Sequence, residues 1–160
     1  MVNNLSVRLP LQRVPVPTMG DIGMKTILKA ELRLPNGRFK ALQFLVDSGS
    51  SITTIPVPRA QGLGLALPSR VDSVEIQSAG GIILQRRRPG RIKLRIPGFN
   101  GIIFDWPCHF VEHESSSPPI SALGLAGILN DLRLTFDGTY SLDARYGFLQ
   151  IERYAVDAPA

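Results

Sequence analysis

Short stretches of alternating apolar and polar residues, separated by clusters of turn-forming residues, run along most of the chain. Met24 to Leu34 and Phe39 to Val46 read as two strands, joined by Pro35-Asn36-Gly37-Arg38. Asn-Gly favours a tight hairpin because both residues tolerate a positive φ angle. The second strand leads directly into Asp47-Ser48-Gly49-Ser50-Ser51, a cluster of turn formers.

The rest of the chain continues this pattern of short strands and turns. Gly80-Gly81 separates two apolar stretches and predicts a second hairpin with a glycine tip. Pro56 to Pro68 predicts a loop with at most a short helical turn, and Leu123 to Asp131 is the best helix candidate, although Gly124 and Gly127 weaken it. We therefore expect a mainly β fold with one short C-terminal helix. Further strands are predicted at Ile52 to Ile55, Val71 to Gln77, Ile82 to Leu84, Arg91 to Ile96, Ile102 to Val111 (interrupted at Pro107), Leu132 to Phe136 and Tyr146 to Tyr154.

Length and composition favour one folded domain. The 160 residues leave little room for two independent cores, and 44% hydrophobic with 19% charged residues is a globular composition. We expect an N-terminal arm over residues 1–20, flexible or dimer-forming, a domain over 21–155 and a tail over 156–160. The arm lacks the uninterrupted apolar stretch of a secretory signal, and no apolar run is long enough to span a bilayer. A soluble cytoplasmic protein without a membrane partner is the expectation.

Basic residues, which give the chain a net charge of +5, are concentrated between positions 86 and 95. Arg91, Lys93 and Arg95 alternate with Ile92 and Leu94, which favours the exposed face of a half-buried strand. No aromatic residues that could stack on bases interleave with them. We therefore expect no nucleic-acid partner.

The single cysteine and the two histidines give no convincing reactive or metal-binding cluster. Cys108 cannot form a disulfide within the chain, so a reducing compartment is compatible. His109 and His113 share a face of a strand but lie too far apart for one coordination shell. His109 and Cys108 point to opposite faces of a regular strand. We predict no metal, no cofactor and a buried Cys108.

The segment Leu45-Val46-Asp47-Ser48-Gly49-Ser50 places a carboxylate directly after a predicted buried strand. A catalytic aspartate needs this arrangement, because the strand fixes its position, glycine lets the backbone approach a substrate, and hydroxyls or amides orient the carboxylate. Two such carboxylates about 3 Å apart share one proton, since like charges that close cannot both ionise. The alternative is an ordinary turn in which the Asp47 side chain caps nearby amides.

This segment resembles the active-site signature of the retropepsin-like, or retroviral-type, aspartic peptidases: apolar-apolar-Asp-Thr/Ser-Gly-Ala/Ser. Two further features of that family occur in the same order, a glycine-containing flap hairpin at Ala79-Gly80-Gly81 and a second apolar-apolar-Gly motif at Ala122-Leu123-Gly124. The resemblance covers the chain from Thr26 to Ile151 and is closest to a cellular or bacterial type of member. It implies the closed-barrel-like retropepsin (acid protease) fold, with a glycine-tipped flap.

The resemblance also implies a role for each residue of the signature. Asp47 would be catalytic, Ser48 would brace the active site across a two-fold axis, and Gly49 would expose backbone to the peptide. Ser50 would donate a hydrogen bond to the outer carboxylate oxygen. Many retropepsins have Arg-Asp or Arg-Asn after the second glycine, where this chain has Leu125-Ala126, so we expect dimer contacts unlike those of viral members.

A single catalytic signature in the chain requires a second chain to bring the other carboxylate. We therefore expect a homodimeric aspartic endopeptidase, in which one Asp47 per subunit activates water to hydrolyse a polypeptide substrate. In the resembling family the chain termini interleave at the dimer interface, for which Leu5 to Val16 and Gly147 to Tyr154 are the candidates. The alternative is a catalytically silent retropepsin-fold module for binding or dimerisation.

Overall fold

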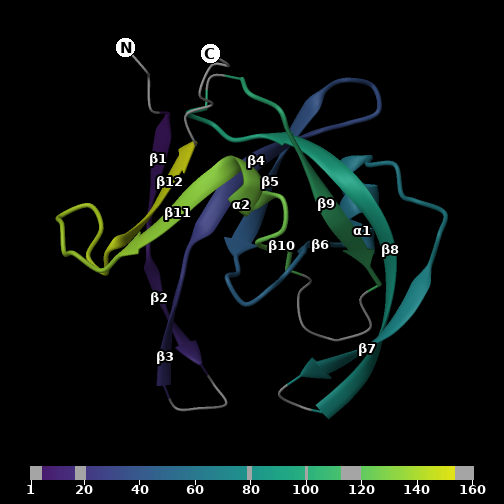
Figure 1. Cartoon of the computed structure of the whole chain (residues 1–160), viewed down its shortest axis with the longest axis horizontal. Coiled ribbons are helices and arrows are strands. Elements are labelled where there is room, and N and C mark those ends of the chain that lie inside the picture. Colours follow the sequence, from purple (N-terminus) through teal and green to yellow (C-terminus); the bar gives the residue numbers. More distant parts are fainter. Residues whose placement is uncertain (1–4, 17–20, 79–80, 100, 113–119, 154–160) are drawn as a thin grey trace, which may run out of the picture.

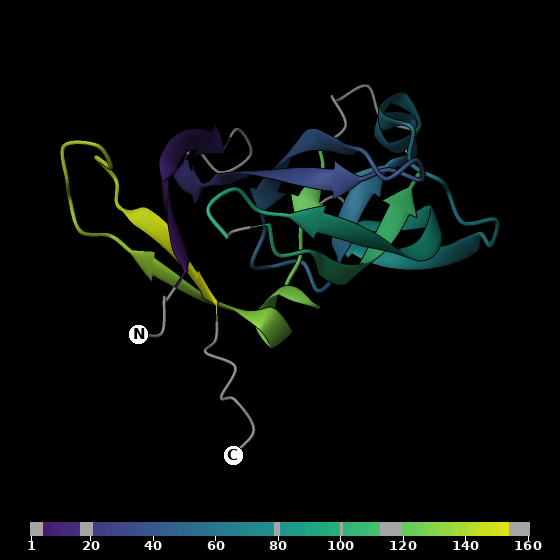
Figure 2. The ribbon, with the colours of Figure 1, turned by 90° about the horizontal axis from the view of Figure 1, so that it is seen from above.

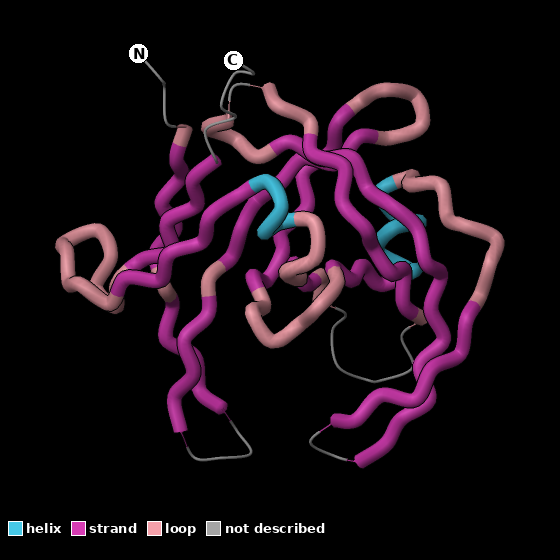
Figure 3. The backbone as a smooth tube through the Cα atoms, viewed as in Figure 1, coloured by secondary structure: helices cyan, strands magenta, loops and turns pink. Residues whose placement is uncertain are grey.

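The fold consists of a β-barrel with a smaller β-sheet beside it (Figures 1 and 2). The computed structural model describes residues 5–16, 21–78, 81–99, 101–112 and 120–153. Strands account for most of the regular structure in this part of the chain (Figure 3), as the sequence pattern predicts.

A seven-stranded sheet in the order β4-β5-β10-β6-β9-β8-β7 forms the barrel. β4 also pairs with β8, with Glu31 opposite Arg95 and Leu32 opposite Leu94, which closes the sheet and leaves β7 outside the ring. Glu31 and Arg95 form an ion pair at 2.6 Å, and this hydrogen bond lowers the pKa of Glu31. The strands are β4 Ile27–Arg33, β5 Phe39–Val46, β6 Thr53–Pro56, β7 Asp72–Ser78, β8 Gly81–Arg95, β9 Phe104–Val111 and β10 Ala122–Leu123.

Alternation along the strands fills the barrel interior. In β4, Leu28, Ala30 and Leu32 are buried while Lys29 and Arg33 are exposed. Successive side chains of a strand point to opposite faces, so this pattern places one face in the core and the other in solvent. The largest fully buried side chains are aromatic: Trp106, Phe44, Phe99 and Phe110.

The smaller sheet has the order β1-β12-β11 and is antiparallel throughout. It consists of β1 Ser6–Pro10, β12 Phe148–Arg153 and β11 Leu132–Asp137. Both edges of β12 are paired within the chain, one with β1 and the other with β11. The N-terminal segment continues as a hairpin of β2 Gln12–Val16 and β3 Asp21–Lys25.

Two helices occur among the described residues, and both differ from the prediction. α1 spans Val57–Leu63, a longer helix than the short turn expected there, and Gly64 ends it with a φ angle of 86°. α2 spans only Ile128–Asp131, because Ala122–Leu123 form β10 and Gly127 has a φ angle of 88°. Neither helix is long and apolar enough to cross a membrane.

Two strands are longer than the sequence pattern indicated. β8 is continuous over 15 residues, where two separate strands were predicted. It pairs with β7 from Gly81 to Arg87 and with β9 from Arg87 to Leu94, so one neighbour takes over where the other ends. β9 runs without a break through Pro107, where an interruption was predicted.

Cys108 lies on β9 and is fully buried, and burial raises the pKa of its thiol to about 12. The thiolate is the reactive form of cysteine. We therefore predict that the native protein at neutral pH is not alkylated by a maleimide, and that one label per chain appears in denaturant. Intact-mass spectrometry checks this, and stoichiometric labelling of the native protein would contradict it.

Candidate active site

Asp47 lies at the point where β5 leaves the barrel wall, and backbone hydrogen bonds fix that point from two sides. The N–H of Asp47 donates to the carbonyl of Leu123 at 3.0 Å, and the N–H of Val46 donates to the carbonyl of Thr26, also at 3.0 Å. β10 runs parallel to β5, with Leu123 opposite Val46. The carboxylate is therefore carried on a rigid part of the fold, as the sequence predicted.

The loop after Asp47 is a tight turn organised around that residue. The N–H of Gly49 donates to Oδ1 of Asp47 at 2.9 Å, and the N–H of Ser50 donates to the Asp47 carbonyl at 3.2 Å. The hydroxyl of Ser50 donates to the carbonyl of Ile52 at 2.8 Å, where the resemblance implied a bond to the carboxylate. Ser48 and Gly49 are exposed and Asp47 is half-buried, so the signature faces outward from the barrel.

Gly124 packs directly against this loop. A Cβ atom added at Gly124 would lie 2.4 Å from the carbonyl carbon of Ile52 and 2.7 Å from its nitrogen, far inside contact distance. The N–H of Gly124 donates to Oγ1 of the fully buried Thr53 at 3.2 Å. The structure thus brings the second glycine motif and the Asp47 loop together.

Leu125 and Ala126 continue the contact through their backbones. Their N–H groups donate to the carbonyls of Ser50 at 3.0 Å and Ser51 at 2.7 Å. Neither bond depends on a side chain, so the Leu125-Ala126 sequence ties the loop to the following segment without the Arg-Asp pair of many retropepsins.

Two supporting residues were not singled out from the sequence. Thr53 is one of them, and its only sequence signal is a β-branched hydroxyl residue shortly after the signature. The other is Trp106, whose Nε1 donates to Oδ2 of Asp131 at 2.7 Å and whose ring atoms would lie 2.7 Å and 2.8 Å from a Cβ atom added at Gly127. Trp106 therefore holds α2 against the barrel, but a lone tryptophan carries no pattern that predicts this.

The predicted flap corresponds to the hairpin of β7 and β8. Ser78 pairs with Gly81, which has a φ angle of 114°, while Ala79 and Gly80 lie outside the described residues. The hairpin extends past the barrel (Figure 1). Ile82 and Leu84 on β8 are exposed by 67% and 66%, so apolar side chains are available along this strand of the hairpin.

Several charged groups elsewhere form surface ion pairs. Arg91 contacts Asp105 at 2.7 Å and Arg86 contacts Glu112 at 3.1 Å, which agrees with an exposed basic strand face. Burial lowers the pKa of His109. Among the described residues, no group of histidine, cysteine or acidic side chains could hold a metal ion.

A cavity of about 520 Å³ lies away from Asp47. Arg33, Leu65, Lys93 and Phe110 are among its lining residues, and none of the lining residues belongs to the loop after β5. An active site shared between two subunits has only half of its walls on each chain, so a single chain need not enclose it. The cavity therefore does not compete with Asp47 as the candidate site.

A barrel closed by β4 and β8, with β10 set between β5 and β6 beside the aspartate loop, is the fold of the retropepsin-like aspartic proteases. The crystal structure of a retropepsin-like aspartic protease from Rickettsia conorii matches the chain with a TM-score of 0.56. The match covers 96% of this chain and 96% of that one, at 15% sequence identity. No family model and no curated protein sequence matches the chain.

The packing of Gly124 generates a stability prediction. Gly124→Ala forces a methyl group into the Ile52 backbone and should lower the free energy of unfolding by about 1–3 kcal/mol or more. Gly62→Ala is the matched control, because its Cβ meets no atom within 4 Å and it lies inside α1. Alanine there should be neutral or stabilising, by up to about 1 kcal/mol. Urea unfolding of both variants measures the difference, and equal stabilities would contradict the close packing.

Proposed function

We propose that the chain is an aspartic endopeptidase that works as a homodimer, with one Asp47 from each subunit. The observation that carries the proposal is the position of Asp47, on a turn held by β10 and Gly124 and facing out of the barrel. A catalytic carboxylate needs this combination of rigidity and access. The retropepsin-like fold supports the same conclusion.

In this mechanism the two Asp47 carboxylates share one proton and hold a water molecule between them. The ionised carboxylate takes a proton from the water as its oxygen attacks the scissile carbonyl carbon. The protonated carboxyl donates its proton to the carbonyl oxygen. Breakdown of the resulting tetrahedral species returns a proton to the leaving nitrogen and breaks the peptide bond.

The remaining signature residues suit the roles proposed for them. Ser48 and Gly49 are exposed beside Asp47, where a second subunit and an extended peptide can reach them. The β7–β8 hairpin is the proposed flap, with Ala79, Gly80 and Gly81 at its tip. The exposed Ile82 and Leu84 favour a peptide substrate with apolar side chains.

Replacing Asp47 tests the catalytic assignment. Asp47→Asn removes the proton-transfer group while keeping its size, and should lower kcat/KM for a peptide-library substrate by about 10²- to 10⁴-fold. Asp105→Asn is the control, because it removes the same charge from a residue paired with Arg91 on the surface. Activity should peak at mildly acidic pH and fall on both sides, since the pair needs one proton. A folded dimer without turnover at any pH would favour the silent binding module.

Subunit mixing tests whether the active site is shared. Adding an excess of Asp47→Asn protein to a fixed amount of wild type should lower the total activity, because most wild-type chains then sit in dimers with one aspartate. The same excess of Asp105→Asn protein should add its own activity. A total hydrolysis rate that does not change when the Asp47→Asn protein is added would show that each chain is active alone.

A further inference from the structure

The barrel wall is interrupted beside the end of β4, where the cavity of about 520 Å³ lies. Among the described residues, the ladder between β4 and β8 ends at the pair of Leu32 and Leu94. The next step of the same register would place Arg33 opposite Lys93. Like charges that face each other directly are destabilising, so these two residues disfavour closure of the wall at this point.

Arg33 and Lys93 are surplus positive charges at the mouth of this cavity. Both line the cavity and both are exposed. Glu31 precedes Arg33 by two residues on β4 and Asp105 lies opposite Lys93, but each of these carboxylates is already bound by an arginine, at 2.6 Å and 2.7 Å. Within the described part of the chain, no ion pair involves Arg33 or Lys93.

The floor of the cavity is apolar. Leu34, Ile92 and Phe110 line it and are buried, and Leu65 from the loop after α1 is half-buried beside them. The lining residues come from four segments of the chain: the end of β4, the loop after α1, β8 and β9. A concave space of about 300–1,000 Å³ with an apolar floor and a few charged groups is typical of a small-molecule site.

We propose that this cavity is a binding site for a small amphipathic anion, a molecule with one carboxylate on an apolar body. The carboxylate lies between Arg33 and Lys93 and accepts hydrogen bonds from both, which replaces a repulsion between two cations with two attractions. The apolar body lies against Ile92 and Phe110 and removes their cavity-facing surface from water. The site is separate from the proposed active site, because none of its lining residues belongs to the Asp47 loop.

The two parts of the cavity together define the class of ligand. A bare anion such as phosphate neutralises the cations but leaves the apolar floor in contact with water. A neutral apolar molecule covers the floor but leaves the cations unpaired. A ligand that carries both a charge and an apolar body satisfies both parts at once.

A titration followed by ¹H–¹⁵N NMR tests the site, with octanoate as the probe. The backbone amides of Leu65, Ala66 and Lys93 should shift with a single dissociation constant, while those of Ser48 and Gly49 beside the catalytic candidate should not. Octan-1-ol has the same apolar chain without the charge, and inorganic phosphate has the charge without the chain. Each should bind about tenfold more weakly than octanoate or less.

Each outcome of the titration decides one part of the proposal. No shift at the cavity with octanoate would overturn the site. Equal binding of octan-1-ol would overturn the role of the cations, and equal binding of phosphate would overturn the role of the apolar floor. The titration uses no peptide substrate, so its result and that of the peptidase assay are independent.

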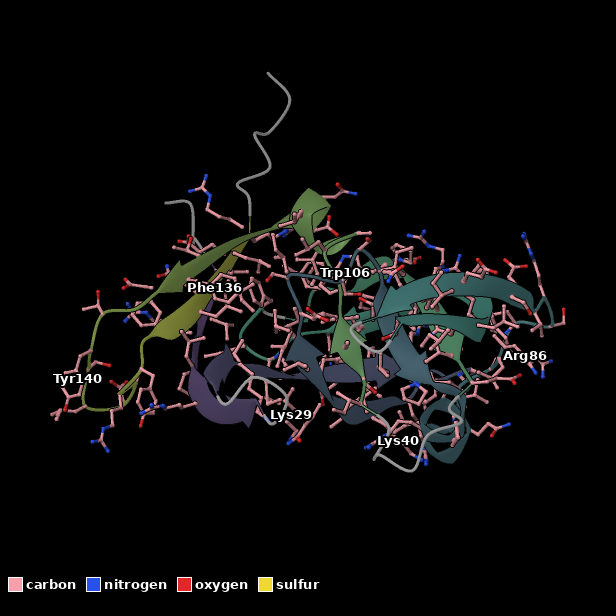
Figure 4. The ribbon with its side chains drawn as sticks, turned by 90° about the horizontal axis from the view of Figure 1, so that it is seen from below. Lys29, Lys40, Arg86, Trp106, Phe136 and Tyr140 are labelled. Atoms are coloured by element: carbon pink, nitrogen blue, oxygen red, sulfur yellow. The ribbon has the colours of Figure 1, made fainter. Side chains whose placement is uncertain are left out.

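Charge removal tests the two cations one at a time. Arg33→Gln and Lys93→Gln should each raise the dissociation constant of octanoate about three- to tenfold, since single exposed charges contribute modestly. Lys29→Gln is the matched control, because it removes the same charge from β4 but does not line the cavity, and Figure 4 shows its side chain pointing away from the barrel. An equal effect of Lys29→Gln would reduce the binding to general attraction by the positive chain and overturn the contact with Arg33 and Lys93.

A filled cavity gives an independent measurement. Ala66 lines the cavity and is exposed, so Ala66→Phe places a large side chain in the space without entering the core. This variant should lose the octanoate-induced shifts at Leu65 and Lys93 while keeping every charge. Urea unfolding checks that its stability matches wild type. A folded Ala66→Phe protein that binds octanoate as tightly as wild type would overturn the location of the site.

Discussion

The contact between Gly124 and the backbone of Ile52 is the constraint on which the candidate site depends. Two segments far apart in the sequence meet there with no side chain between them, and hydrogen bonds from Gly124, Leu125 and Ala126 secure the contact. A parallel strand pair continues the same contact at Leu123, which lies opposite Val46. The Asp47 turn is therefore supported both by β10 and by the backbone at Gly124. Close backbone packing of this kind removes the freedom that a loop would otherwise have.

Much of this arrangement could be predicted from the sequence, and the exceptions have physical causes. Alternation in β4 and β5 and the Asn-Gly turn gave the hairpin that leads into Asp47, because these signals are local. The helix predicted from Leu123 to Asp131 was wrong over its first half, since Leu123 pairs with β5 and the positive φ angle of Gly127 places the start of α2 at Ile128. The support by Trp106 and Thr53 was not predictable, because each acts on a residue distant in sequence.

The smaller sheet supplies part of the hydrophobic core within one chain. β12 is paired on both sides by strands of its own chain, and Leu149 and Ile151 are buried. Burial of these two side chains removes apolar surface from water without a contribution from a second chain.

The continuity of β8 has a mechanical consequence. The strand pairs with β9 from Arg87 to Leu94 and with β4 at Leu94 and Arg95, while from Gly81 to Arg86 its paired strand is β7. The hairpin is therefore anchored to the barrel wall at one end only. The hydrogen bonds between β7 and β8 resist bending and twisting of this two-stranded ribbon, so the stiffness of the paired strands sets how far the hairpin can deflect.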